Sequence, residues 1–200
     1  MKTGTGKTGR PISFDKDAAL EAAMLLFWER GFEGSSMADL TRVMGLNPSS
    51  IYAAFGDKHE LFSLAVKRYL SSRAQYATEA LAEPTLEKVI RALFNKTVDF
   101  LTTPGHPPTC MTLAGATGCS IDAAPARDLT TAVRIENEVA MKERFLRAQK
   151  GGELSKEINV NDYTKYLSSI LAGLSIQAAN GSTKAELIRT ARMALRYLGY

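Results

Sequence analysis

The chain has 200 residues, which is enough to bury the core of one domain or of two small ones. Its hydrophobic content of 45% and charged content of 23% are typical of a soluble globular protein, and no apolar run reaches the ~18 residues that a membrane span needs. Two cysteines are too few for a disulfide framework, and the net charge of +4 mildly favours an anionic partner.

The chain begins with a basic arm rich in Gly and Thr, residues 1–13, which lacks the apolar stretch of a secretory signal. We therefore expect a cytoplasmic protein. Arg10 and the lysines before it can lie along the DNA minor groove or the phosphates, or the arm is simply a solvated terminus. The GTGKTG stretch at Gly4–Gly9 does not fit a phosphate-binding loop, because the first glycine of that motif would fall on Met1.

The first predicted helix runs from about Asp15 to Arg30 and carries an apolar stripe, and Gly31 stops it. Trp28 lies near its end, where a large aromatic side chain is expected to pack in the core or at a domain junction.

Two short helices joined by a tight turn are predicted next. Ser36 caps the first of them and Gly45 supplies its left-handed stop. Asn47 caps the second, with Pro48 at its first position. This order is typical of a helix-turn-helix, whose second helix enters the DNA major groove. The alternative is a helical hairpin in an ordinary core.

The first turn of the second helix is small and polar, with Pro48, Ser49 and Ser50, so its backbone can approach base edges and phosphates closely. Tyr52 is placed to give its hydroxyl to a phosphate, and Lys58 can reach the same DNA backbone.

The rest of the chain also has helical periodicity and no convincing strand alternation, which predicts an all-α protein with about nine helices. One helix is expected to continue from Asp57 to about Ala80 and to act as a lever between two domains. An irregular, proline-rich segment covers residues 103–109. The other predicted helices cover residues 85–102, 110–120 (short), 124–150, 162–179 and 183–198.

The stretch from about Gly9 to Tyr69 closely resembles the N-terminal domain of TetR-family transcriptional repressors. The resemblance rests on FWERGF at the close of the first helix, on the Ser-Ser start of the second, and on IYAAFGDK at Ile51–Lys58. It implies DNA contacts from the positions of Ser36, Pro48, Ser49, Tyr52 and Lys58, a homodimer, and a ligand-controlled C-terminal domain. With the candidates above and Arg42, the predicted DNA contacts are Arg10, Ser36, Arg42, Pro48, Ser49, Ser50, Tyr52 and Lys58.

The expected organisation is therefore an arm (1–13), a helix-turn-helix domain (14–57) and an effector-binding and dimerisation domain (58–200) that starts with the connecting helix 58–80. The last two helices carry apolar bands that can meet their symmetry mates in a four-helix bundle. The same bands also fit an intramolecular core, and the resemblance favours the dimer. The predicted dimer residues are Tyr166, Ile170, Gly173, Leu174, Leu187, Ala191 and Leu195.

An effector pocket is expected between helix 85–102, the segment around Cys110 and helix 124–150. Few charges are expected to point there, so an uncharged or aromatic small molecule is predicted, with no cofactor. For any single candidate, plain core is the favoured alternative, because a pocket uses few of a domain's apolar residues. These candidates are Phe94, Phe100, Cys110, Met111, Leu113 and Phe145.

The leading hypothesis is a dimeric repressor that binds a palindromic double-stranded operator and is released by an effector. A metal- or redox-responsive regulator is an alternative, because His106, Cys110 and Cys119 offer soft ligands or a regulatory disulfide. A DNA-binding partner or activator without a small ligand is another. An enzyme is not expected, because the two histidines lie in different predicted domains and no nucleophile elbow or dinucleotide fingerprint is present.

Overall fold

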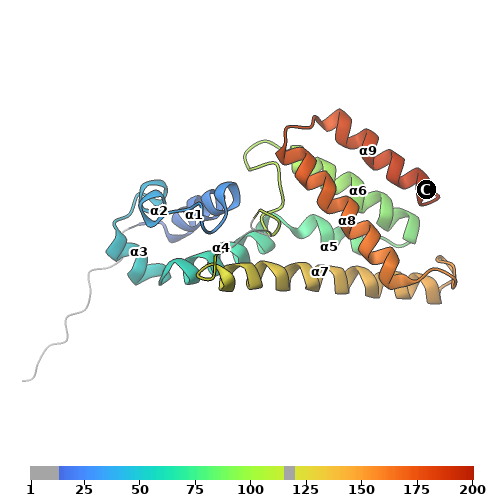
Figure 1. Ribbon diagram of the computed structural model, residues 1–200, viewed down its shortest axis with the longest axis horizontal. Helices are drawn as coiled ribbons and strands as arrows, with labels where there is room; N and C mark the ends of the chain where they lie inside the picture. Colours follow the sequence, from blue (N-terminus) through green and yellow to red (C-terminus); the bar gives the residue numbers. More distant parts are fainter. Residues whose placement is uncertain (1–13, 115–119) are drawn as a thin grey trace, which may run out of the picture.

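The computed structural model describes residues 14–114 and 120–200, so the predicted arm, including Arg10, and Cys119 lie outside the described residues. The described residues form nine α-helices and no strand, which confirms the predicted all-α class (Figure 1). None of these helices is both long and apolar enough to cross a membrane. The helices are α1 (Lys16–Arg30), α2 (Met37–Met44), α3 (Pro48–Phe55), α4 (Lys58–Ser72), α5 (Gln75–Leu81), α6 (Leu86–Thr102), α7 (Ala124–Lys150), α8 (Val160–Ala179) and α9 (Lys184–Tyr197).

The first four helices begin where the sequence predicts, because each is preceded by a side chain that accepts a free backbone N–H. Asp15 caps α1, Ser36 caps α2, Asn47 caps α3, and Asp57 forms a capping box with Glu60 at the start of α4. These four helices share one apolar core, to which α1 and α4 contribute most of the buried side chains. The core therefore fixes the turn between α2 and α3 against both α1 and α4.

The predicted single helix from Asp57 to Ala80 is wrong, because the structure divides it into α4 and α5 at Arg73 and Ala74. Ser71 and Ser72 both donate their hydroxyls to the carbonyl oxygen of Arg68, at 3.0 and 2.7 Å. Serine side chains that bind the backbone in this way compete with the regular helical hydrogen bonds. The backbone N–H of Ala74 then reaches the carbonyl of Tyr69, five residues back, and α5 begins at Gln75.

The C-terminal helices form a second core, built mainly by α6, α8 and α9 with part of α7. In Figure 1, α7 runs along one side of the whole molecule, from beside α4 to the far end, and α8 crosses above it. The helix starts differ slightly from the prediction: Asn159 caps α8, which begins at Val160, and Thr183 caps α9. These shifts of one or two residues leave the predicted apolar faces unchanged.

The segment between α6 and α7 runs back toward the first domain. Residues 103–109 have no regular structure, as predicted from their prolines and glycine. The short helix predicted at 110–120 is not seen in the part of that stretch that is described, where residues 110–114 form turns.

Ion pairs between the first helix and the fourth tie the ends of the N-terminal domain together. Glu21 of α1 accepts hydrogen bonds from Arg68 at 2.5 Å and from Arg73 at 2.8 Å. Burial by itself raises the pKa of Glu21, but the hydrogen bonds and charges of the two arginines together outweigh it, so the pKa lies below the usual value. The carboxylate is therefore held ionised between α1 and the end of α4.

Candidate functional site

The third helix lies at one end of the molecule with its first turn exposed (Figure 1). Ile51 and Phe55 are buried in the core on one side of α3, whereas Pro48 and Ser49 are exposed, Ser50 is half-buried, and the Tyr52 side chain is 52% exposed. Asn47 Oδ1 accepts the N–H of Ser50 at 2.8 Å and the hydroxyl of Ser49 at 2.7 Å. The predicted contact residues of this helix therefore face solvent on a turn that is held by its own cap.

Ser36 and Arg42 meet at a shared carboxylate on α2. Asp39 accepts the Ser36 hydroxyl at 2.6 Å and forms an ion pair with Arg42. The hydrogen bond from Ser36, followed by that from Arg42, lowers the pKa of Asp39 to about 2. Arg42 nevertheless remains largely exposed, so a phosphate can replace Asp39 as its partner.

Lys58, at the start of α4, lies over an aromatic ring instead of extending into solvent. Its amino nitrogen is 4.3 Å from the centre of the Phe32 ring, a cation–π arrangement. Burial lowers the pKa of Lys58, and the charge of Glu33 acts in the opposite direction. A DNA phosphate would have to draw this side chain away from Phe32.

A cavity of about 460 Å³ lies between α5, α6, α7, α8 and the turn at residues 110–113. We call it the effector cavity. Its size is in the range that holds small organic ligands. The three elements predicted to surround an effector pocket all contribute to it, and α5 and α8 complete the wall.

Only two of the six predicted pocket residues line the effector cavity. These two are Cys110 and Leu113. Phe94 and Phe145 are fully buried in the C-terminal core, and Phe100 stacks on other aromatic rings, so these three do not line it. Helical spacing alone cannot distinguish a core ring from a cavity-lining ring. Met111 lies elsewhere, in the second cavity described below.

The expectation that few charges point toward the pocket is wrong. Arg134 and Glu138 of α7 and Lys165 of α8 all line the effector cavity, beside hydroxyl groups such as those of Thr97 and Ser175. The sequence of the long polar helix α7 does not indicate which of its charged side chains face the cavity. A ligand in this cavity would meet both apolar and charged walls.

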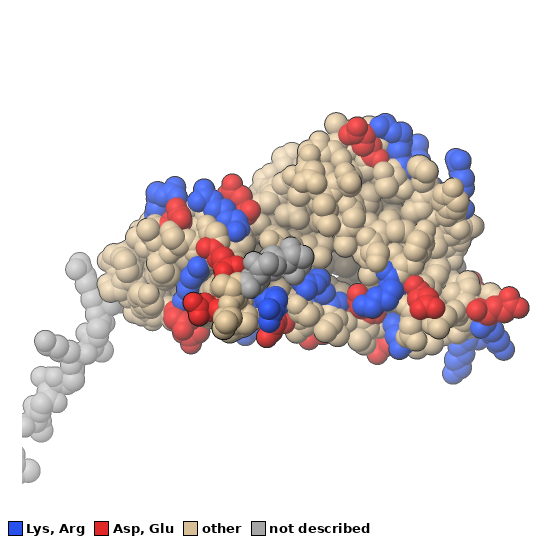
Figure 2. Space-filling view, viewed as in Figure 1, with Lys and Arg blue, Asp and Glu red and all other residues tan. Residues whose placement is uncertain are grey.

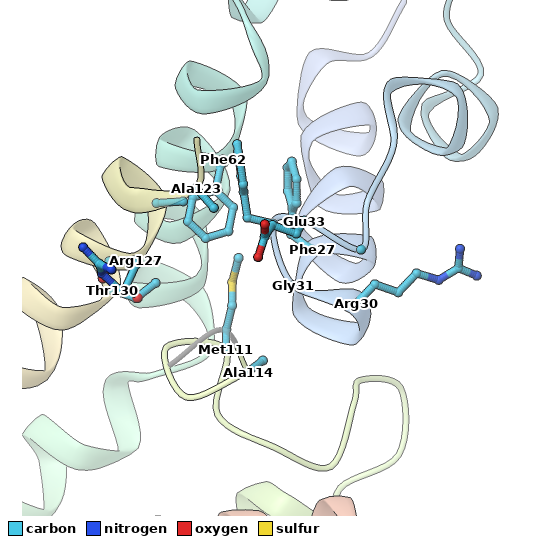
Figure 3. Close-up of a pocket in the computed structure, with 13 residues that line it drawn as sticks. Phe27, Arg30, Gly31, Glu33, Phe62, Met111, Ala114, Ala123, Arg127 and Thr130 are labelled. Atoms are coloured by element: carbon cyan, nitrogen blue, oxygen red, sulfur yellow. Dashed lines mark hydrogen bonds between the residues drawn. The ribbon is translucent and has the colours of Figure 1, made fainter. Parts of the chain in front are cut away.

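A smaller cavity of about 190 Å³ lies between the first domain and the start of α7. Figure 3 shows Met111 pointing into it toward Phe27 and Phe62, whereas the side chain of Arg30 points away. Met111 is buried and belongs to the core of the N-terminal domain. The turn that supplies Cys110 to the effector cavity thus supplies Met111 to the other domain.

Residues 109–114, which we call the bridging segment, connect the effector cavity to the N-terminal helices. Trp28 of α1 donates its indole N–H to the carbonyl oxygen of Thr109 at 2.8 Å. Tyr69 of α4 donates its hydroxyl to Cys110 Sγ at 3.4 Å, and burial raises the pKa of Tyr69, so the donor stays protonated. Ser175 of α8 accepts the N–H of Cys110 at 2.9 Å. The bridging segment is therefore bonded to α1, α4 and α8 together.

Trp28 packs at the domain junction, as predicted. It is fully buried, and its ring stacks on His106 at 4.6 Å between centres and on Phe100 at 5.7 Å. The same stacking places His106 in an aromatic cluster with Trp28 and Phe100. Among the residues that the structure describes, no group of three or more His, Cys, Asp or Glu side chains could hold a metal ion. Cys119 lies outside them, so a pairing with Cys110 stays a prediction.

The predicted dimer residues divide into two sets. Leu174, Leu187, Ala191 and Leu195 are 1–6% exposed in the single chain and belong to its own core, so they cannot supply a surface to a partner. The other three predicted residues are more accessible: Tyr166 is exposed, Gly173 is half-buried, and Ile170 is half-buried at the edge of the same core. The sequence missed the exposed apolar residues beside them: Ile176, Met193 and Tyr197. Figure 2 shows that the surface over the C-terminal half of α8 is nearly free of charged side chains.

Residues 19–65, which contain the whole of α2 and α3, match the family of bacterial regulatory proteins, tetR family. The HTH-type transcriptional repressor ComR of Escherichia coli (strain K12) is 30% identical over 190 residues, which cover 94% of this chain and 90% of ComR.

The chain belongs to the tetR family of bacterial regulatory proteins.

Two further comparisons agree with this assignment to the tetR family. The HTH-type transcriptional repressor BdcR of the same Escherichia coli strain is 29% identical over 188 residues, covering 93% of this chain and 90% of BdcR. A cysteine mutant of the TetR family transcriptional regulator CifR, solved in complex with 26-bp double-strand operator DNA, superimposes with a TM-score of 0.89 at 34% identity. That match covers 94% of this chain and 98% of CifR. The family consists of DNA-binding transcriptional regulators and not of enzymes.

Proposed function

We propose that this protein is a homodimeric, sequence-specific transcriptional repressor that leaves its operator when a small molecule occupies the effector cavity. The observation that carries the DNA-binding part is the exposed first turn of α3, which is held by the Asn47 cap on a buried base of Ile51 and Phe55. A polar helix turn fixed in this way can enter a major groove without unfolding its support. As a regulator of a bacterial chromosome, it acts in the cytoplasm.

The proposed contacts use the exposed groups at this end of the molecule. Ser49 and Pro48 approach the groove, while the Tyr52 hydroxyl and Arg42 bind phosphates on either side. Ser36 caps α2 and Ser50 lies in the first turn of α3, and their hydroxyls can add phosphate contacts. Lys58 joins only after leaving Phe32. Arg10 belongs to an arm that follows the DNA backbone.

The proposed domain division has three parts. They are the arm at 1–13, the helix-turn-helix domain at 14–57 and the effector domain at 58–200.

Effector control is supported by the bridging segment, because it has one side in the effector cavity and the other in the N-terminal core. Cys110 and Leu113 face the effector cavity, whereas Met111 and Ala114 face the first domain. A ligand that displaces this turn must disturb its bonds to α1 and α4. In a dimer this changes the separation of the two α3 helices, which must match half-sites about one DNA turn apart. The presence of a cavity favours this function over a regulator without a ligand.

The homodimer is supported by the exposed apolar face of α8 and α9, and a second copy of the chain is its proposed partner. Ile176 is 57% exposed, and Gly173 beside it has no atom within 4 Å of where a Cβ would stand, so a second helix can approach closely. We expect Ile176→Glu to give monomers that retain their helical content and lose operator binding. Ile121→Glu is the control, because it introduces the same charge at another exposed isoleucine, 92% exposed, that lies before α7 and away from the proposed interface. Sedimentation of both variants measures the outcome, and a dimeric Ile176→Glu protein would refute this interface.

The first test of the function is fluorescence anisotropy with the DNA upstream of the protein's own gene, with random DNA as competitor and with salt varied. Tight binding that survives the competitor supports a sequence-specific regulator. By linkage, an effector and the operator must weaken each other's binding by the same factor. Saturating operator DNA that leaves the affinity of a releasing ligand unchanged would contradict effector control, while the DNA-binding function would stand.

A further inference from the structure

Of the three charged side chains that line the effector cavity, two form an ion pair with each other and the third does not. Glu138 on α7 forms an ion pair with Lys165 on α8. Arg134, one helical turn before Glu138, instead donates to two neutral oxygens: to the carbonyl of Thr112 at 2.5 Å and to the hydroxyl of Thr131 at 2.8 Å. Within residues 14–114 and 120–200, Arg134 makes no ion pair, so the lining keeps one uncompensated positive charge.

The guanidinium of Arg134 is held in place before any ligand arrives. Its two hydrogen bonds engage Nη1 and Nη2 once each, so the other N–H donors of the group have no partner among the described residues. A fixed guanidinium with free donors matches a carboxylate, phosphate or sulfonate, and it binds such anions more strongly when it is partly removed from water. Arg134 is half-buried in the described structure.

The rest of the cavity wall specifies the body of the ligand. Leu81, Leu93, Leu101, Met141 and Leu171 supply apolar surface from four different helices. We propose that the effector cavity binds an amphipathic small molecule with an apolar body and one anionic headgroup, and that Arg134 binds the headgroup. The proposal rests on the proposed function, in which this cavity is the effector site.

Binding of an anion at Arg134 acts directly on the bridging segment. The guanidinium that would bind the headgroup is the one that holds the Thr112 carbonyl against α7. An anion on the remaining donors draws the guanidinium toward itself, which weakens this hydrogen bond and loosens the turn that contacts Trp28 and Tyr69. Arg134 would thus both select an anionic ligand and transmit its binding to the bridging segment.

Two fluorescent probes of nearly the same shape test the proposal on the full chain. They are 8-anilinonaphthalene-1-sulfonate, an anion, and N-phenyl-1-naphthylamine, which is uncharged. Ala172→Phe, which narrows the cavity, must weaken both probes. Arg134→Gln is expected to weaken the anion about tenfold, at the lower end of the range for one charge-assisted hydrogen bond, and to change the neutral probe by less than about twofold. Arg134→Lys is expected to keep part of the anion's affinity.

Glu138→Gln supplies a test of opposite sign that does not depend on the structural role of Arg134. It removes the carboxylate that neutralises Lys165, so the anionic probe should bind about threefold more tightly and the neutral probe unchanged. A general loosening of the cavity would weaken both probes instead. Decanoate, decyl phosphate and decanol as competitors then distinguish a carboxylate from a phosphate headgroup.

Several outcomes would overturn the proposal. One is an equal effect of Arg134→Gln on both probes or on neither, and another is decanol competing as well as decanoate. If Ala172→Phe leaves both probes unaffected, they bind outside the cavity and the proposal fails. If the neutral probe is sensitive to Ala172→Phe and releases the operator fragment while the Arg134 variants change nothing, the effector cavity stands and only the anionic headgroup is refuted.

Discussion

Replacing Trp28 with Phe tests how strongly the bridging segment is held to the N-terminal domain. The indole is fully buried and its N–H donates to Thr109 at 2.8 Å, so the change removes one hydrogen bond and leaves a carbonyl without this partner. That loss costs about 1 kcal/mol. The smaller ring also loses part of the contact with His106 and Phe100, which lowers the stability by about 1–2 kcal/mol more. We expect the free energy of unfolding to fall by about 2–3 kcal/mol.

Tyr69→Phe is the matched variant at the same junction. It removes only the hydroxyl that donates to the Cys110 sulfur at 3.4 Å, a weak acceptor, and should cost less than about 1 kcal/mol. Urea unfolding is followed by circular dichroism, because Trp28 is the only tryptophan and its fluorescence is lost with it. The protomer concentration is kept constant, since the unfolding of a dimer depends on it. If Trp28→Phe costs no more than Tyr69→Phe, the indole does not hold the segment.

Three further predictions concern the DNA-binding domain. Tyr52→Phe should weaken all DNA sites alike, by about three- to tenfold, because a phosphate contact carries no base information; anisotropy that shows lost discrimination at a single base pair would contradict this. Gly45→Ala should destabilise the protein by about 1 kcal/mol in urea, because Gly45 has φ 65° and a Cβ there meets no atom within 4 Å, which leaves backbone strain as the cause; an unchanged midpoint would refute it. Glu21 has a lowered pKa in the folded protein, so its contribution is complete above its ordinary pKa and is lost as the pH falls through the lowered value. Glu21→Gln should therefore lower the free energy of unfolding by about 1 kcal/mol at neutral pH and make it depend less on pH in acid. If the unfolding free energies of the two proteins fall with the same slope as the pH is lowered, this prediction is wrong.

The sequence by itself determined the helix-turn-helix. Each of its signals acts within a few residues: the Ser36 and Asn47 side chains reach N–H groups three positions ahead, and Gly45 adopts its left-handed conformation where no other residue fits well. Such bonds form in the same way whatever the rest of the chain does. The division between α4 and α5 is also local, but its cause, two serine hydroxyls turned back on one carbonyl, is not visible in the hydrophobic pattern.

The tertiary structure alone decided which apolar and charged faces meet. Periodicity shows that a helix has an apolar face, but Leu174 faces the protomer's own core whereas Ile176, two residues later, faces outward. In the same way, Arg134 on the long polar helix α7 looks like a solvated residue in the sequence and lies in the cavity wall in the structure. Contacts such as Trp28 with Thr109 join residues 81 positions apart. No local preference encodes such contacts, because they depend on how whole helices pack.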